Sequence, residues 1–512
     1  MLNSLKALVV VLVIALIVFA LGKPLCLKFM DPADFARRRA VWLTLTCAGF
    51  LSPTLWVYAG VALPLVFWAA RADRHPTALF LLVLLAVPPA RLPIPLPLIN
   101  QLFELSTYRI LALALLVPTA IRILRSGASS PPGLAKVDVV VLAYGVLQLA
   151  LYMPYESITN TLRRAFLFGL DTYVLYFVFS RAAASKAALR DTLASFWFGC
   201  AVLVPITVFE SLKGWLLYTG ITDVWGVPIQ FSWLFRAEAL RAQASAGHSL
   251  TMGFLFAVSF GFWLYLGVRL QSKRLLWAVG IFMWFGLVST YARAPWVGAA
   301  AILAAYMLIS PAGRSRLVSA IAALAVLAVP FSMTQLGTRV IGLLPFIGTA
   351  EQDNVDYREQ LATVSWRLIK QNPFFGSPFA LNYMEELRQG QGIIDLVNTY
   401  ASISLFYGLV GCSLFVCCLA YPLLRSLLTV RAVTATDTDG ANLGAAVTSC
   451  MLGVLLMLAT TSAIGAVDLL IWVMAGLCSA YPAAMYAHAV SSQPAPARFS
   501  GLRPSAALRQ TP

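Results

Sequence analysis

The sequence predicts an all-α fold, a polytopic transmembrane helical bundle that carries one large hydrophilic loop. Of the 512 residues, 60% are hydrophobic and only 11% are charged, and the mean hydropathy is +0.81. These values lie far outside the range of soluble globular domains. Several apolar runs also reach the roughly 18–20 residues that a helix needs to cross a bilayer. We therefore expect about fifteen membrane segments.

The predicted membrane segments follow one another almost to the end of the chain. The first resembles a signal peptide in length, but its basic region is thin and no small-residue cleavage site follows, so we interpret it as a retained helix. The block 41–70 is too long for one helix and is broken at Ser52-Pro53, which predicts two short or re-entrant helices. The expected spans are 5–22, 41–52, 54–70, 77–90, 108–124, 137–153, 166–182, 191–212, 249–268, 275–291, 294–309, 317–332, 399–424, 447–461 and 466–486.

The loops between these spans predict the orientation of the chain. Lys and Arg gather in stretches that all fall on one side if the spans alternate, and such loops face the cytoplasm. We expect four parts: transmembrane helices at 1–332 with about 12 spans, an exterior loop at 333–398, three further spans at 399–486, and a disordered cytoplasmic tail at 487–512. The polar loop 432–445 is expected to be mobile, and the smaller loop 214–247 to face the exterior.

The charge pattern argues against nucleic acid as a ligand, and the cysteine spacing argues against a disulfide framework or a metal site. The net charge is +16, but no basic tract or stacking module accompanies it, so nucleic acid is not an expected ligand. None of the eight cysteines has CxxC spacing and none lies in the large loop. A disulfide framework or a metal site is therefore not expected.

Polar side chains near membrane depth are the first functional candidates, because burying them in lipid costs several kcal/mol. Arg293 lies in a tight turn between two apolar helices, where Tyr291 and Trp296 would hold its planar fork toward a phosphate. An interface arginine beside an aromatic belt is the alternative. Glu210 would pair with an arginine or reach interfacial water. His248 opens a span, as an interface residue or as a catalytic one. Asp171 and Asp468 lie near span ends, where a helix-terminus role is the simpler interpretation.

The loop 333–398 differs in chemistry from the rest of the chain. Apolar residues recur at helical spacing over Tyr357–Asn372, with Arg358 and Arg367 between them, which predicts an amphipathic helix on the membrane surface or over a cavity. Asn372-Pro373 ends this helix, and Met384–Arg388 predicts a second, shorter one. The alternative is a solvated connection without chemistry.

Three stretches of the sequence carry a resemblance to a known family. Arg358 is followed by a helix and then by Pro373-Phe374-Phe375-Gly376, like an arginine, a helix and Pro-x-x-Gly. Asp395–Tyr400 and Tyr407–Gly411 are similar to a His-Asn-x-Tyr and Gly-Leu-x-Gly block, and Ser289–Trp296 to a Ser-Arg-x-x-Trp turn. Over roughly residues 200–425 the chain resembles the O-antigen ligase and polymerase superfamily of bacterial polysaccharide assembly.

The resemblance implies a fold, an activity and a location. Such proteins are GT-C-like, metal-independent, inverting glycosyltransferases of the bacterial inner membrane that need no cofactor. They move a glycan from undecaprenyl diphosphate, at the periplasmic face, to lipid A–core or to another carrier-linked repeat. Polysaccharide export or chain-length proteins are possible partners. By this resemblance Arg293 and Arg358 neutralise the leaving diphosphate, and the substrate-binding residues are Tyr291, Trp296, Arg367, Asn398, Tyr400 and Glu210.

One position departs from the family pattern. Val397 stands where the ligases have the histidine proposed as general base, and valine cannot take a proton. Asp395 is the nearest replacement, and His248 is the second. This departure favours a polymerase of exopolysaccharide or O-antigen over a lipid A–core ligase. A flippase or transporter and a non-catalytic assembly partner are the alternative functions.

Overall fold

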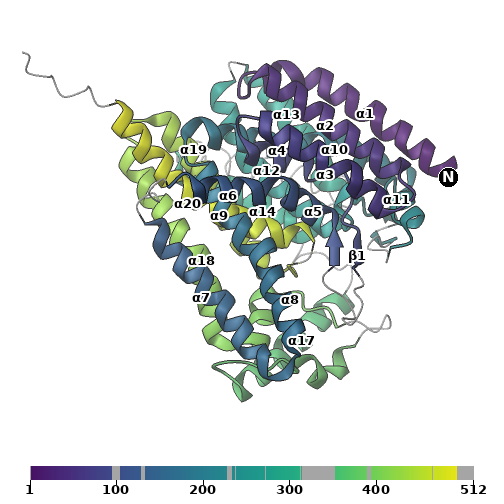
Figure 1. Cartoon of the computed structure of the whole chain (residues 1–512), viewed down its shortest axis with the longest axis vertical. Coiled ribbons are helices and arrows are strands. Elements are labelled where there is room, and N and C mark those ends of the chain that lie inside the picture. The colour runs from purple at the N-terminus through teal and green to yellow at the C-terminus, as the bar shows by residue number, and fades with distance from the viewer. Residues whose placement is uncertain are drawn as a thin grey trace, which may run out of the picture.

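The structure is a computed structural model that describes residues 2–94, 104–127, 133–227, 233–236, 238–270, 272–311, 313, 352–388, 394–463 and 465–492. It confirms the predicted all-α helical bundle (Figure 1). In this part of the chain, ten helices are long and apolar enough to cross a membrane. The predicted span 317–332 and residues 493–512 of the predicted tail lie outside the described residues, and the expectation of disorder is wrong for 487–492, which continue the last helix.

The N-terminal region contains α1 (Leu2–Cys26), α2 (Pro32–Leu51), α3 (Leu55–Ala72) and α4 (Pro76–Val83). The block 41–70 is divided as predicted, because Ser52 ends α2 and the Thr54 side chain caps the first turn of α3. The segment 77–90 is buried throughout but helical only as far as Val83. Pro88 and Pro89 follow, and proline cannot continue a helix. Non-helical backbone is tolerated at membrane depth only when protein surrounds it.

The middle of the chain adds two short β-hairpins and most of the remaining spans. Each hairpin is antiparallel, with β1 paired to β2 and β3 paired to β4. The elements are β1 (Arg91–Pro93), β2 (Glu104–Ser106), α5 (Thr107–Leu111), η1 (Ala112–Leu116), α6 (Val117–Arg125), α7 (Leu134–Tyr152), η2 (Met153–Tyr155), α8 (Ile158–Phe168), η3 (Gly169–Val174), α9 (Leu175–Ala182), α10 (Lys186–Lys213), α11 (Thr219–Trp225), β3 (Phe235–Arg236), β4 (Ala239–Leu240), η4 (Ala244–Ala246), α12 (Ser249–Arg269), α13 (Lys273–Ser289) and α14 (Arg293–Ile309).

Four helices form the centre of the bundle. The windows within α10, α12, α19 (Thr438–Leu458) and α20 (Ala466–Ser492) are more than four-fifths buried, whereas α1 and α7 lie at the periphery. The helix α14 packs on α12 and α19, and α18 (Thr399–Val433) packs on α7, α19 and α20. A helix that is apolar on all sides belongs in such a core.

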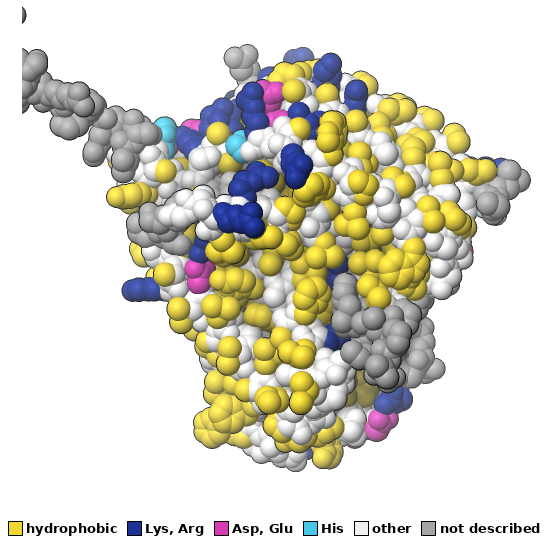
Figure 2. All heavy atoms as spheres, in the orientation of Figure 1, with side chains coloured by type: hydrophobic (Ala, Val, Ile, Leu, Met, Phe, Trp, Pro, Cys, Tyr) yellow, Lys and Arg dark blue, Asp and Glu magenta, His cyan; other side chains and the backbone are white. Residues whose placement is uncertain are grey.

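The Lys and Arg side chains gather at one end of the bundle (Figure 2), and the N-terminus lies beside the loop 214–247. Figure 2 shows hydrophobic side chains over most of one face, with Lys and Arg side chains gathered toward the end opposite α17 (Gln352–Gln371). Ser4 at the start of α1 lies beside Gly220 of α11, so the N-terminus is on the side of the loop 214–247. The alternation of the predicted spans also places the N-terminus on the same side as this loop.

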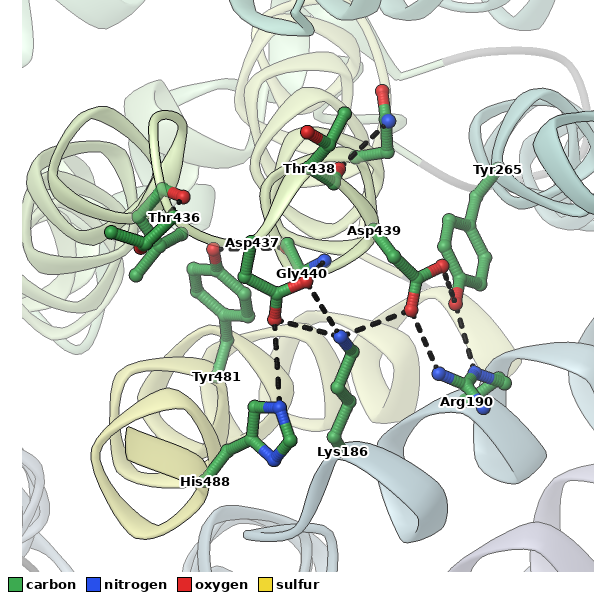
Figure 3. A network of polar contacts seen from close by, with 12 residues as sticks. Lys186, Arg190, Tyr265, Thr436, Asp437, Thr438, Asp439, Gly440, Tyr481 and His488 are labelled. Carbon is green, nitrogen blue, oxygen red and sulfur yellow. Dashed lines mark hydrogen bonds and ion pairs between the residues drawn. The ribbon is translucent and has the colours of Figure 1, made fainter. Parts of the chain in front are cut away.

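An ionic network fastens the turn between α18 and α19 (Figure 3). Lys186 bridges Asp437 at 2.7 Å and Asp439 at 3.1 Å, and Arg190 and Arg269 each reach Asp439 at 2.9 Å. The expectation of a mobile loop at 432–445 is therefore wrong. Residues from 438 onward belong to α19, and the aspartates of the turn tie it to α10 and α12. The composition of the segment did not indicate this ordered turn, because the Lys and Arg side chains that pair with its aspartates come from distant helices.

A second charged group is buried completely within the N-terminal helices. The Arg38 side chain is inaccessible to solvent and makes bidentate contacts with two carboxylates. Its Nε and Nη2 donate to Asp73 at 2.8 and 2.7 Å, and its Nη1 and Nη2 donate to Asp191 at 2.7 and 2.8 Å. Ser195 accepts a further bond from Nη1 at 2.9 Å. This group joins α2, the loop after α3, and α10.

The helix predicted at 357–372 is α17, and it covers one end of α18. Its apolar face, with Leu361, Val364 and Ile369, packs against Met384 and Leu387 of the following turns and against Leu405 of α18. Those turns are η5 (Ala380–Tyr383) and η6 (Glu385–Leu387), which replace the short α-helix expected at 384–388. The apolar face of α17 therefore packs on protein.

The two glycine motifs of the sequence form one backbone crossing. Gly408 interrupts α18 with φ 68° and ψ −174°, a conformation that is essentially restricted to glycine. The backbone of 373–377 fills the gap: Leu409 donates to the Pro373 carbonyl at 2.7 Å, and Ser377 donates to the Leu405 carbonyl at 2.8 Å. A Cβ on Gly408 would lie 2.1 Å from the Phe374 oxygen. The motifs thus attach α17, η5 and η6, which we call the cap, to α18.

Gly408→Ala is expected to destabilise the protein by about 3 kcal/mol, because backbone strain adds to the steric clash. The midpoint of unfolding in detergent measures this loss. Gly60→Ala in α3 is the matched control, since nothing lies within 4 Å of its added Cβ. Equal midpoints for the two variants would contradict the crossing as a structural joint.

Candidate functional site

The turn between α13 and α14 holds a strained tyrosine and a half-buried arginine. Tyr291 has a positive φ of 48°, and Arg293 is the first residue of α14. Trp296 donates from Nε1 to the Leu287 carbonyl at 3.2 Å, so it braces the turn from within. Arg236 of β3 donates to the Tyr291 carbonyl at 2.7 Å. The hairpin β3–β4 therefore brings a second arginine to the predicted phosphate turn.

Arg358 on α17 lies near this same hairpin. It makes no hydrogen bond or ion pair with the described residues, but its charge is within reach of Asp395 and of Arg236. Loss of hydration lowers the pKa of Arg358 from its ordinary value, Asp395 opposes this shift, and Arg236 adds to it. Neighbouring guanidinium groups repel one another, which favours an anion bound between them. Arg236 is thus the link between the two arginines that the sequence predicts for one site.

We call Arg236, Arg241, Arg293 and Arg358 the arginine cluster. Arg241 belongs to it because its Nε donates to the Thr290 carbonyl at 3.4 Å, one residue before Tyr291. The four come from the loop 214–247, from the α13–α14 turn and from α17, three segments far apart in the sequence. Such a convergence of cations suits a phosphate or diphosphate group.

Arg367 lies away from this cluster. Nine residues separate it from Arg358, which places the two on opposite sides of a helix with 3.6 residues per turn. Its Nη2 donates to Glu386 at 2.8 Å in an exposed ion pair. This geometry favours a surface role for Arg367 and makes it a natural control for Arg358.

Asp395 lies between the cap and the start of α20. Tyr357 accepts from the Asp395 backbone N–H at 3.0 Å, and Ser462 donates to Asp395 Oδ1 at 3.0 Å. The other carboxylate oxygen makes no hydrogen bond within the described part of the chain, and the side chain is exposed. Asp395 therefore has one oxygen free to accept a proton while the other is held in place.

Asp395 also lines a cavity of 780 Å³. The walls come from α7, α8, η3, the first half of α18 and the start of α20. Charged residues line it together with aromatic ones, among them Tyr144, Phe415 and Trp472. No group of three or more His, Cys, Asp or Glu in the described ranges could hold a metal ion. Asp395 is the residue that connects the cavity with the arginine cluster.

His248 is the N-cap of α12. Its Nδ1 accepts from the Leu250 N–H at 3.1 Å, and burial and the nearby Arg241 lower its pKa from 6.5 to about 4. The neutral ring that accepts at Nδ1 carries its proton on Nε2. Such a ring donates a hydrogen bond and has no lone pair to offer as a base. The geometry therefore favours Asp395 over His248 as proton acceptor.

This lowered pKa predicts a dependence of stability on pH. Between pH 6.5 and 4 the unfolded chain protonates His248 and the folded chain does not, so acidification destabilises the fold through this residue. His248→Asn keeps a capping side chain that does not titrate. Thermal unfolding in detergent at pH 7.5 and pH 5 should show a smaller drop for the variant than for the wild type. An equal drop would show that His248 is not the group responsible.

Glu210 is fully buried and holds the chain that precedes His248. Its carboxylate accepts from the backbone N–H groups of Leu217, Gln243 and Ala244 at 2.9, 3.0 and 2.8 Å. The arginine partner that the sequence favoured is replaced by these three donors. A buried carboxylate satisfied in this way positions the loop 214–247 around the site.

Asn398 and Tyr400 fix the start of α18. Asn398 Oδ1 accepts from the Ala401 N–H at 3.0 Å as an N-cap, and Tyr400 donates to the Leu455 carbonyl of α19 at 2.8 Å. Val397 is half-buried and packs against the apolar face of α17. The contacts of all three residues favour positioning of Asp395 over direct binding of substrate.

Two parts of the site were missed by reasoning from the sequence. Arg236 gave no signal, because only the fold brings it to Tyr291. The cavity did leave a pattern: Asn160, Arg164 and Asp171 recur at helical spacing along α8 and η3, which begin before the predicted span 166–182, and all three line the cavity. A polar stripe along a membrane helix indicates such a cavity.

A comparison with protein families matches residues 278–416 to the O-antigen ligase family. The matched stretch runs from α13 to the first half of α18, and it contains Arg293, Arg358, Asp395 and the glycine crossing. No curated protein matches the chain. Residues 278–416 of this multi-pass membrane protein are thus similar to the O-antigen ligase family, whose members are glycosyltransferase-like ligases and polymerases.

Proposed function

We propose that this protein is a metal-independent, inverting glycosyltransferase that takes a glycan from undecaprenyl diphosphate at the periplasmic face of the bacterial inner membrane. The acceptor is another glycan, so the protein is a polymerase of exopolysaccharide or O-antigen. The observation that carries the proposal is the position of Asp395, between the arginine cluster and the polar cavity. The family match over the same residues supports it.

The arginine cluster provides the site for the leaving group. As the bond between the anomeric carbon and the phosphate oxygen breaks, undecaprenyl diphosphate leaves with the bonding electrons and its negative charge grows. Fixed cations aimed at that charge stabilise the transition state. Arg358 makes no hydrogen bond or ion pair with the described residues that would have to break before it meets the phosphate, and Arg236 holds the turn that carries Arg293.

Asp395 is the proposed base. The acceptor hydroxyl oxygen attacks the anomeric carbon from the face opposite the diphosphate, and its proton passes to the free oxygen of Asp395. One displacement of this kind inverts the anomeric centre. A positioned carboxylate contributes roughly 10²–10⁴-fold to such a step. Ser462 keeps the other oxygen in place.

The absence of a histidine beside Asn398 supports the polymerase over the ligase. Val397 packs against the cap and leaves Asp395 as the ionisable group at this position. The acceptor is then recognised by the cavity next to Asp395, which has the polar lining that a saccharide needs.

A deletion strain complemented with wild type, Arg293→Ala or Asp395→Asn tests the proposal. We expect the wild type to restore long polymer, and both variants to express normally but to leave short or carrier-linked repeats. Full polymer from both variants would contradict glycan transfer at this site. Unpolymerised repeats held on the cytoplasmic face in the deletion strain would favour transport instead.

A further inference from the structure

The cavity has a strongly acidic lining. Among the described residues, two guanidinium groups line it, those of Arg163 and Arg164, against the five carboxylates of Glu104, Glu156, Asp171, Asp395 and Asp468. A diphosphate would meet repulsion there and has the arginine cluster beside it. The charge thus separates the two ligands: the anionic carrier belongs at the cluster, and the cavity suits a ligand rich in neutral hydroxyl groups.

Most of the charged side chains in the cavity are already held by partners. Arg109 donates to Asp171 at 2.7 Å, and Arg164 pairs with Glu156. Glu104, Asp468 and Arg163 differ, because none of these three side chains makes a hydrogen bond or ion pair with a described residue. Polar groups removed from bulk water without a partner cost free energy until a ligand or water satisfies them. Two such carboxylates and one such guanidinium in a single cavity suit the hydroxyl groups of a sugar.

Three aromatic side chains line the same cavity. Tyr144, Phe415 and Trp472 contact one another, with Tyr144 and Trp472 rings 6.2 Å apart and Phe415 and Trp472 rings 6.1 Å apart. Large flat apolar faces beside a few fixed polar groups are typical of small-ligand sites, and the volume of 780 Å³ lies within their range of roughly 300–1,000 Å³.

We propose that this cavity is the saccharide subsite for the acceptor and that Asp468 is a specificity-determining residue that binds its hydroxyl groups. Asp468 and most of the walls lie outside the family-matched residues 278–416, so the acceptor specificity comes from the remainder of the chain. Asp395 on the rim then receives the acceptor hydroxyl next to the carrier. The assignment of the bound sugar as acceptor rests on the proposed function, whereas saccharide binding in the cavity does not.

Two soluble probes test the saccharide subsite and the proposed carrier site separately, on purified protein in nanodiscs. One is the repeat-unit oligosaccharide released by mild acid from the surface polymer of the producing strain, and the other is farnesyl diphosphate. We expect Asp468→Asn to weaken oligosaccharide binding about tenfold, the loss of one charge-assisted hydrogen bond, and to leave farnesyl diphosphate binding unchanged. Asn160→Ala, on α8, should likewise weaken oligosaccharide binding.

The outcomes bear separately on the saccharide subsite and on the carrier site. Unchanged oligosaccharide binding in both cavity variants, or weakened farnesyl diphosphate binding in Asp468→Asn, would overturn the saccharide subsite. Failure of Arg358→Ala to weaken farnesyl diphosphate would count against the proposed carrier site and leave the saccharide subsite standing. Retained farnesyl diphosphate binding also shows that the cavity variants are folded.

Discussion

Replacing Arg358 by alanine is expected to lower the rate of glycan transfer by about 10²–10³-fold, the loss typical of removing one fixed group that stabilises a developing oxyanion. Arg358 shares its surroundings with Arg236 and Asp395 and has no contact with described residues that would retain it elsewhere. The loss should appear mainly in kcat, because the charge on the diphosphate grows as the bond breaks.

Arg367→Ala is the matched control for this measurement. It removes the same charge from the same helix, but from the opposite side and from an exposed ion pair with Glu386, a type of pair worth about 0–1 kcal/mol. Transfer should stay close to the wild-type rate. Arg358→Lys should recover only part of the loss, since lysine keeps the charge without the planar fork. Equal effects of Arg358→Ala and Arg367→Ala would refute the role of Arg358.

Arg38→Ala is expected to destabilise the protein by about 3–5 kcal/mol, because it leaves Asp73 and Asp191 buried without their cation. The midpoint of unfolding in detergent measures this effect. Arg39→Ala removes a neighbouring arginine for which the described residues offer no hydrogen bond or ion pair, and it should change the midpoint little. A small loss for Arg38→Ala would mean that the carboxylates find other partners or take up protons.

The fold could be predicted largely from local patterns. Apolar runs located most of the spans, the break at Ser52-Pro53 divided α2 from α3, and the spacing over 357–372 predicted α17. The segment 77–90 shows the limit of this reasoning, because hydropathy reports burial and Pro88-Pro89 decides where the helix stops. The turn at 433–438 shows another, since its order depends on Lys186, Arg190 and Arg269 from other helices.

The site could be predicted only where a residue carries its chemistry in its own type and neighbourhood. Arg293, Arg358 and Asp395 were candidates on that basis and share one region of the fold through Arg236. Residue type alone did not indicate that Asn398 caps a helix or that Glu210 binds three backbone N–H groups. The role of Asp468 as a cavity carboxylate depends on which helices lie beside α20, and no local pattern contains that information.

The most direct test of glycan transfer uses purified protein and undecaprenyl-diphosphate-linked repeat units alone. Mass spectrometry follows two products, a carrier-linked dimer with a new glycosidic bond and free undecaprenyl diphosphate. The proposed mechanism predicts both in equal amounts from the wild type, and neither from Asp395→Asn above background. Intact carrier-linked repeats after incubation with active wild-type preparations, or undiminished dimer formation by Asp395→Asn, would contradict it.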